Sequence, residues 1–253
     1  MKAAGPRWPG FWSAAGLVVF LSVWEITAQT GLLPRTMVPA PSAVPTAFLS
    51  ELRNGIWARS VFASLSHYAS GLAIGSILGV AAGVTVAMFP RIDAAQSGIA
   101  RVLRPIPPLA WIPFALIWFG ASESAAAFII AIGVFWVNYF AAMGAVRAID
   151  PGLHELALAF GQRSLGARLT KIILPAASPG ILSGLRVGLG QGWMAVVAAE
   201  LFGISGVGQR MNEAAGLLAT DVLVLYMLTI AALYALSDAI FQGISRRLLA
   251  WTP

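Results

Sequence analysis

Residues that could bind a partner or a solute lie at two places in this sequence. The segment from Asp150 to Pro179 carries several ionisable side chains between two long apolar runs, so it lies outside a bilayer. Within it, the Glu155 carboxylate can accept a charge-assisted hydrogen bond from an Arg or Lys of a partner. Further along, Arg186 and Glu200 lie inside an apolar run, where an ionisable group marks either a function or an ion pair. These residues predict recognition of a protein partner and either a polar lining for a solute or structural ion pairs.

A catalytic constellation is missing from the sequence. There is no cysteine, the two histidines are His67 and His154, and no metal-ligand spacing or phosphate-binding Gly-rich loop followed by Lys-Ser or Lys-Thr occurs. The run G-I-S-G-V-G at 203–208 lacks the acidic residue that should follow it in a dinucleotide site. We therefore expect no catalytic residue, metal site or cofactor in this chain. We interpret His67 as a hydrogen-bonded packing residue in preference to a proton relay.

The composition is that of a membrane protein. Of 253 residues, 58% are hydrophobic and 10% are charged, and the mean hydropathy is +0.82, whereas soluble domains are about 45–50% apolar. The net charge of +6 does not indicate nucleic-acid binding, because the positive residues lie at the ends of apolar runs. We predict an all-α, polytopic protein of the lipid bilayer, with one transmembrane domain over 1–253.

Apolar runs of about 20 residues predict six spans. We place the first at 11–33 and interpret it as a retained span, because no small-residue cleavage site of a signal peptide is evident. The other five form a core over 60–250 that includes a loop at 150–175. Short helices at the membrane surface are expected at 46–58 and 94–104. The core spans are expected at 60–90, 105–122, 124–146, 178–203 and 221–245.

Two of these spans carry a further signal. The third begins with Pro105, Pro107 and Pro108, so its entrance must be kinked or non-helical, and such backbone at membrane depth borders protein or a water-filled cavity. Two glycine series with a spacing of four predict close helix packing within one subunit or between two, with a pathway role as the alternative. The series are Gly71, Gly75, Gly79 and Gly83 in the second span, and Gly180, Gly184, Gly188 and Gly192 in the fifth.

The distribution of Lys and Arg predicts the orientation. Arg186 falls inside the membrane, and four residues, Arg35, Arg53, Arg59 and Arg210, fall on one side. The remaining eleven of the 16 fall on the side of the 150–175 loop. This asymmetry predicts that the loop and both termini are cytoplasmic.

The loop itself is predicted to form two short helices. Asp150 is a good N-cap, Gly161 suits a helix-ending turn, and a second helix begins at Ser164 and ends at Pro175. The first helix lacks the basic face of an interfacial anchor, so its apolar stripe favours docking into a protein groove over lying in the membrane interface. The stripe has the spacing i, i+3, i+4, i+7 and consists of Leu153, Leu156, Ala157 and Phe160.

The fifth span carries most of the polar residues expected to line a pathway. Arg186 and Glu200 are 14 residues, or about 21 Å, apart along a helix, too far to pair, but about 40° apart in azimuth, so both can face one seam. We predict that this seam, with Gln191 and with Asn138 of the fourth span, lines the translocation pathway. The alternative for Arg186 is that it snorkels to the cytoplasmic edge and pairs with a neighbour such as Asp238.

Four segments resemble the membrane subunits of binding-protein-dependent ABC importers. Glu155, Leu156, Ala157 and Gly161, followed by I-I-L-P at 172–175, are similar to the E-A-A-x-x-x-G…I-x-L-P loop of that family, with Leu156 in place of the usual Ala. The other segments are R-P-I-P-P-L-A-W-I-P-F-A-L-I-W-F-G from Arg104 to Gly120, G-L-R-V-G-L-G from Gly184 to Gly190, and A-A-E from Ala198 to Glu200. Together they resemble the nitrate, sulfonate and taurine branch.

The resemblance implies a type I importer permease fold and alternating access. In that family the loop is the coupling helix, which here implies contacts from Leu153, Glu155, Leu156, Ala157, Phe160, Gly161 and Arg163 to an ATPase. The implied partners are two cytoplasmic ATPase subunits, which hold ATP and Mg²⁺, a second permease copy in a homodimer, and an extracytoplasmic solute-binding protein. The implied location is the cytoplasmic (inner) membrane, and the implied substrate is a small anion or zwitterion such as a sulfonate, taurine, nitrate or bicarbonate.

Two other hypotheses compete with this one. A self-sufficient secondary transporter or channel is expected to show buried Asp, Glu and His residues and often an inverted repeat, and a membrane enzyme is expected to show a catalytic constellation. The sequence shows few of these features. Residues 204–220 either close the outer mouth and contact the binding protein or only connect two spans.

Overall fold

The computed structural model describes residues 9–31, 34, 36–162 and 164–251. Every regular element in this part of the chain is helical, which confirms the predicted all-α class. In chain order the elements are α1 (Pro9–Gln29), η1 (Pro41–Ala43), α2 (Val44–Arg53), α3 (Ile56–Met88), α4 (Pro90–Leu103), η2 (Pro108–Trp111), α5 (Ile112–Phe119), α6 (Glu123–Arg147), α7 (Pro151–Ala159), α8 (Leu165–Arg168), η3 (Leu169–Ile173), α9 (Leu174–Glu200), α10 (Val207–Gly216) and α11 (Thr220–Leu248).

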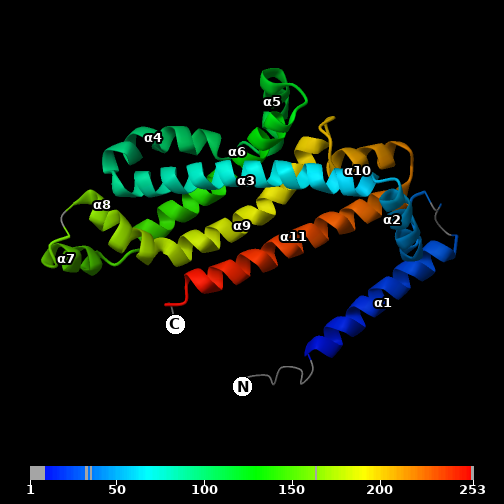
Figure 1. Cartoon of the computed structure of the whole chain (residues 1–253), viewed down its shortest axis with the longest axis horizontal. Helices are drawn as coiled ribbons and strands as arrows, with labels where there is room; N and C mark the ends of the chain where they lie inside the picture. The colour runs from blue at the N-terminus through cyan, green and yellow to red at the C-terminus, as the bar shows by residue number, and fades with distance from the viewer. Residues whose placement is uncertain (1–8, 32–33, 35, 163, 252–253) are drawn as a thin grey trace.

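Four helical segments are long and apolar enough to cross a membrane. They are α3, α6, α11 and the continuous run α8–η3–α9 over Leu165–Glu200, with 33, 25, 29 and 36 residues. These segments correspond to the second, fourth, sixth and fifth predicted spans, and Figure 1 shows them extending along the long axis of the molecule. The described residues therefore contain the main membrane-crossing helices that the sequence predicts.

The third span predicted at 105–122 is not one continuous helix in the structure, and its crossing of the membrane stays a prediction. α4 and the η2–α5 segment meet at an angle of 90°, and α5 has only eight residues, about 12 Å of helix. The prolines explain the break, since Pro105, Pro107 and Pro108 supply no N–H groups for a continuous helix. If this bent pair counts as one crossing, the described residues contain five. The predicted kink is confirmed.

The N-terminal elements differ in detail from the prediction. α1 ends at Gln29, short of residue 33, and it is not among the helices long and apolar enough to cross a membrane in the described part of the chain, so the count of six spans stays a prediction. The surface helix expected at 46–58 is α2, which ends earlier, at Arg53. A turn at Gly55 with φ +68° separates it from α3, and this left-handed conformation favours glycine.

The two glycine series hold α6 between α3 and α9. A Cβ added to Gly79 of α3 would lie 2.6 Å from the Phe135 carbonyl oxygen of α6, and one added to Gly188 of α9 would lie 2.9 Å from Asn138 Oδ1. All four glycines of the α3 series face α6, as do Gly180 and Gly184 of the α9 series, whereas Gly192 faces Tyr68 of α3. Close packing inside one subunit, one of the predicted alternatives, is therefore confirmed.

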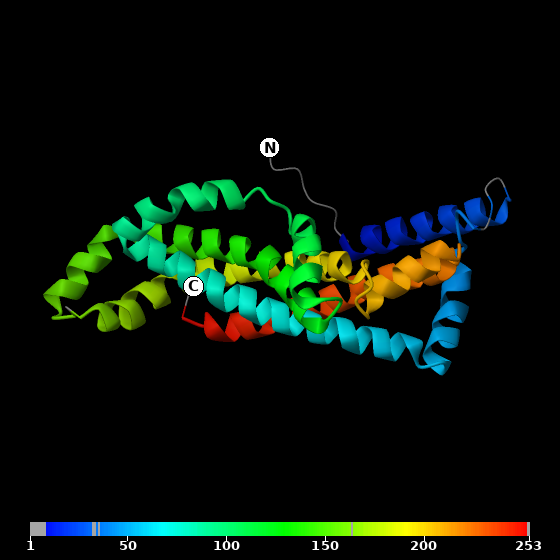
Figure 2. The same cartoon turned by 90° about the horizontal axis from the view of Figure 1, so that it is seen from above.

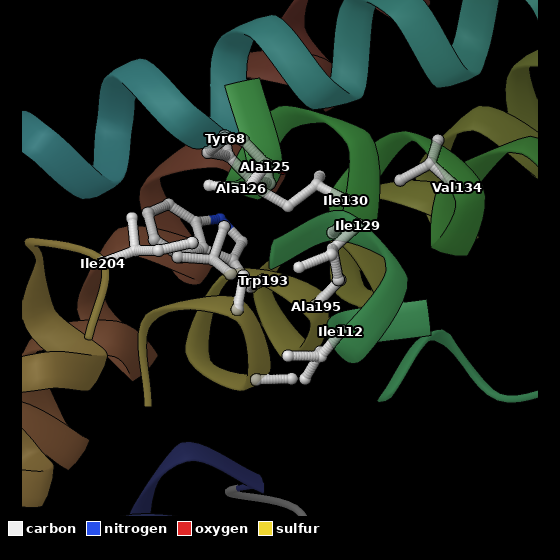
Figure 3. Packing of buried hydrophobic residues seen from close by; sticks show 14 of the residues in the cluster. Tyr68, Ile112, Ala125, Ala126, Ile129, Ile130, Val134, Trp193, Ala195 and Ile204 are labelled. Carbon is white, nitrogen blue, oxygen red and sulfur yellow. The ribbon is translucent and has the colours of Figure 1, made fainter. Parts of the chain in front are cut away.

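Large buried side chains fill the rest of this three-helix core (Figure 3). The Tyr68 and Trp193 rings stack with centroids 4.4 Å apart, and Ile129 and Ile130 of α6 lie beside them. Ile112 of α5 also joins the cluster. Because α3, α6, α9 and the start of α5 share one core, they form a single body to which the other elements attach.

The two ends of this body carry different elements. α7 and α8 lie at one end, and α2 and α10 lie at the other (Figures 1 and 2). At the α2 end, Arg210 of α10 donates to Glu51 of α2 at 2.7 and 3.1 Å, and the Tyr226 hydroxyl of α11 donates to the same carboxylate at 2.8 Å. The Arg210 guanidinium lowers the pKa of the Glu51 carboxyl, so this tie holds at neutral pH and is lost only as pH falls through the lowered pKa.

Candidate functional site

The segment after α6 forms the predicted helix, turn and helix. The Asp150 carboxylate accepts a hydrogen bond from the Gly152 N–H at 2.8 Å at the start of α7, and the Ser164 hydroxyl accepts one from the Ala167 N–H at 3.2 Å at the start of α8. Between the two helices Gly161 has φ +76°, a left-handed conformation that favours glycine. α7 ends at Ala159, slightly before the predicted residue.

This segment presents apolar side chains to solvent. Leu153 is 41% exposed and Phe160 75% exposed, and α7 projects from the end of the molecule in Figure 1. Glu155 is also exposed and pairs with no cation among the described residues. Leu156 and Ala157 lie in α7 with side chains outside the described structure, and Arg163 lies outside the described residues. An exposed apolar ridge beside an unpaired carboxylate is suited to a protein groove that supplies a cation.

The connection from α7 to the core differs from the prediction. The second short helix does not end at Pro175, because α8 continues through the π-helical turn η3 into α9 without a break. Pro175 lies in the first turn of α9, next to this π turn, where the local change in hydrogen bonding accommodates a residue without an N–H. α8, η3 and α9 therefore form one continuous helical run from this segment into the packed core.

The four residues predicted to line one pathway are separated in the structure. Arg186 faces α11, where its guanidinium binds both carboxylate oxygens of Asp238 at 2.6 and 2.9 Å. The alternative pairing with Asp238 is thus confirmed, and a pathway role for Arg186 stays a prediction. Gln191 lies on another face of α9, in a groove of about 360 Å³ with Pro108 and Trp136. The predicted common seam is therefore wrong, because azimuth on one helix does not determine which neighbours cover it.

Asn138 and Glu200 lie inside the subunit, so their predicted place on a pathway wall is wrong. Asn138 is 1% exposed and donates to the Ser76 hydroxyl at 3.0 Å, opposite Gly188 where three helices cross. Glu200 is 0% exposed and accepts hydrogen bonds from the Ser64 hydroxyl and the Gly208 N–H, both at 2.8 Å. A buried carboxylate with this many partners serves packing of the protein itself.

The Glu200 carboxylate joins three elements. His67 Nδ1 of α3 lies 2.9 Å from its second oxygen, which agrees with the interpretation of His67 as a packing residue. The Ser64 hydroxyl also accepts the Val207 N–H at 2.9 Å, so the first N–H groups of α10 end on Ser64 and Glu200. Glu200 thereby fixes the start of α10 against α3 and α9. The spacing of Ser64 and His67 on an uncharged span is the sequence signal that could have indicated this partner.

We expect Glu200→Gln to destabilise the protein by about 1.5–3 kcal/mol, because the neutral amide accepts weaker hydrogen bonds from Ser64 and Gly208 than the carboxylate does and turns its NH₂ group toward His67. The measurement is the thermal unfolding midpoint of the detergent-solubilised chain, followed by tryptophan fluorescence. Glu213→Gln is the matched control, since Glu213 pairs with Arg210 at 47% exposure and should cost less than about 1 kcal/mol. Equal midpoints for the two variants would contradict the assigned role of Glu200.

The sequence comparisons agree with the geometry. The chain matches the family described as binding-protein-dependent transport system inner membrane component over residues 71–250. It is 31% identical to the taurine transport system permease protein TauC of Escherichia coli over 249 residues, covering 94% of this chain and 89% of TauC. It is 29% identical to a putative aliphatic sulfonates transport permease protein, SsuC, of Bacillus subtilis over 234 residues, covering 92% and 84%. It is 31% identical to the bicarbonate transport system permease protein CmpB of Synechococcus elongatus over 249 residues, covering 93% and 88%.

A solved structure shows the same fold. A chain of the MetNI methionine ABC transporter in an inward-facing conformation superposes with a TM-score of 0.65 at 21% identity, covering 77% of this chain and 97% of that chain. The type I importer permease fold is thus confirmed for the part of the chain that the two share. The family match and the 31% sequence identity to TauC over most of the chain, together with the shared fold, establish the family. This chain belongs to the inner-membrane permease components of binding-protein-dependent ABC transport systems.

Proposed function

We infer that this permease works as a homodimer with two cytoplasmic ATPase subunits and imports a small anion or zwitterion. The observation that carries the proposal is the exposed α7 helix, with Leu153, Glu155 and Phe160 beside the left-handed Gly161. The relatives TauC, SsuC and CmpB, named for taurine, aliphatic sulfonates and bicarbonate, support this substrate class. ATP and Mg²⁺ bind to the partner ATPase, and this chain contributes the pathway and no catalytic group.

The geometry suggests how ATP hydrolysis drives transport. Closure of the ATPase dimer moves the docked α7, and the continuous α8–η3–α9 run carries this movement into the body formed by α3, α6 and α9. The close glycine packing of α6 against both neighbours makes these helices move together. Rocking of this body against the second copy opens the pathway alternately to the two sides of the membrane.

The proposed partners occupy different surfaces. The α7 end faces the cytoplasm with both termini, as the Lys and Arg distribution indicates, and the solute-binding protein contacts the opposite end at α2 and α10. A second permease copy and lipid cover the apolar side chains left exposed on α1 and α5, among them Val18, Phe20 and Ile117. In this arrangement residues 204–220 close the outer end of the pathway and contact the binding protein, and do not only connect two spans.

Reconstitution in liposomes tests the proposal. The permease is reconstituted with its ATPase and ATP inside the vesicles and the binding protein outside. These vesicles should take up taurine, methanesulfonate or bicarbonate, and omission of the ATPase should abolish uptake. Uptake by the permease alone, driven by a solute or proton gradient, would support the secondary-transporter hypothesis and contradict this one.

A further inference from the structure

Arg104 stands out among the cations near the membrane-crossing helices. It follows α4 at the corner before the proline-rich break, and its guanidinium carbon lies 4.3 Å from the centre of the Phe140 ring of α6. No acidic side chain among the described residues pairs with it. Phe140 lies about 10 Å inside the end of α6 by the helix rise. A guanidinium without an acidic partner is costly against lipid, so this one is suited to face water, protein or an anion.

Two neighbouring grooves, largely apolar apart from a few polar side chains, meet at Arg104 and Phe140. Arg104 and Phe140 line both a groove of about 530 Å³, between α4 and α6, and the groove of about 360 Å³ that contains Gln191 and Trp136. The extended backbone at Pro107, directly before the turn of 3-10 helix η2, borders the second groove. Backbone of this kind at membrane depth borders protein or a water-filled cavity, so the groove is suited to hold a solute.

The charges in this groove favour an anion. Arg101 and Arg104 both line the larger groove, and its single acid, Asp93, is already bound to Arg147 at 2.6 Å. The groove therefore keeps positive charge without a counter-ion among the described residues. Arg186 is the opposite case, because its Nε and one Nη group both donate to Asp238. Of these two arginines, Arg104 is the one whose guanidinium has no acidic partner among the described residues.

We propose that Arg104 and Gln191 form a binding site for a small singly charged oxyanion, such as a sulfonate, a carboxylate or bicarbonate, on the translocation pathway. The planar guanidinium binds two oxygens of such a group at once, and Gln191 contributes an amide to the same groove. The Trp136 ring provides an apolar wall for a short aliphatic part. This site deepens the proposed import function and rests on it.

Chemical labelling of arginine tests the site without requiring transport. The permease–ATPase complex in nanodiscs of phosphatidylcholine is treated with phenylglyoxal, with methanesulfonate as the probe and chloride at equal ionic strength as the control. Peptide mass spectrometry then gives the labelling rate of each arginine. Methanesulfonate should slow the labelling of Arg104 at least fivefold and leave that of Arg91, an exposed arginine on the same helix outside the groove, within twofold. Equal labelling of Arg104 with and without methanesulfonate would overturn the site.

Two further arms separate other origins of protection. If phosphatidylglycerol protects Arg104 in nanodiscs and methanesulfonate does not, the site binds a lipid headgroup and the proposal is wrong. In reconstituted vesicles, Arg104→Gln should lower ATP-driven methanesulfonate uptake at least tenfold while the ATPase stays bound, and Arg104→Lys should lie between it and the wild type. Wild-type uptake by Arg104→Gln would refute only this site, whereas failure of the wild-type permease to bind an ATPase would refute the proposed function.

Discussion

Gly161→Asp is expected to uncouple the permease from its ATPase while the protein still folds and inserts. At φ +76° an L side chain costs about 1–2 kcal/mol, and relief of this strain changes the angle between α7 and α8. A Cβ at Gly161 meets no atom within 4 Å, so the effect on the core itself is small. We expect substrate-stimulated ATP hydrolysis to fall at least tenfold, or the ATPase to be lost on purification.

Gly166 provides a matched control for this substitution. It lies on α8, only five residues away, with open space around it and an ordinary helical backbone, so Gly166→Asp adds the same charge without strain. ATPase retention and stimulated hydrolysis should stay near the wild-type values in this variant. Glu155→Ala should weaken ATPase binding through the loss of a charge-assisted hydrogen bond worth about 1.5–3 kcal/mol. Wild-type coupling in both Gly161→Asp and Glu155→Ala would show that α7 is not the coupling element.

Gly79→Leu is expected to prevent assembly of a stable permease. Its Cβ would lie 2.6 Å from the Phe135 carbonyl oxygen, and a main-chain atom cannot move aside as a side chain can. The two backbones must separate, which removes packing along the whole contact of α3 with α6 at a cost of more than about 3 kcal/mol. The measurement is the yield of monodisperse protein after detergent extraction, together with its unfolding midpoint.

The control for the glycine series lies on α6 itself. Gly144 has no atom within 4 Å of an added Cβ and is exposed, so Gly144→Leu should give near wild-type yield. This pair keeps the substitution constant and changes only the surface on which the new side chain lies. Similar yields from Gly79→Leu and Gly144→Leu would mean that the close approach of α3 and α6 does not stabilise the fold.

The sequence contained enough information for the coarse fold but not for the pairing of helices. Glycines at every fourth position predict a close contact between helices. The main partner of both series, α6, has no glycine series of its own, so the sequence did not identify it. The coupling segment was predictable because its caps and its turn are local interactions within a few residues. The break in the third span was predictable from Pro105, Pro107 and Pro108, but its angle of 90° depends on tertiary packing.

The site residues show the same division between local and long-range information. The sequence indicated that Arg186 and Glu200, as ionisable residues in an apolar run, need partners. It did not indicate which ones, because the partner of Arg186 lies on α11 and those of Glu200 lie on α3 and α10. Hydrogen bonds over such sequence separations leave no periodic pattern. Arg104 was counted only as a charge at the membrane edge, because its place against Phe140 depends on how the corner after α4 folds onto α6.

Cysteine cross-linking tests the central claim, that α7 is the surface which binds the ATPase. The chain has no cysteine, so a single one can be introduced as its only thiol, and the cysteine-free permease gives the background. Phe160 and Leu217 are both 75% exposed and lie at the α7 end and the α10 end of the molecule. With a short thiol–amine cross-linker, Phe160→Cys should give a covalent permease–ATPase product and Leu217→Cys should not. Cross-linking of the ATPase to Leu217→Cys, without a product from Phe160→Cys, would contradict both the docking surface and the orientation in the membrane.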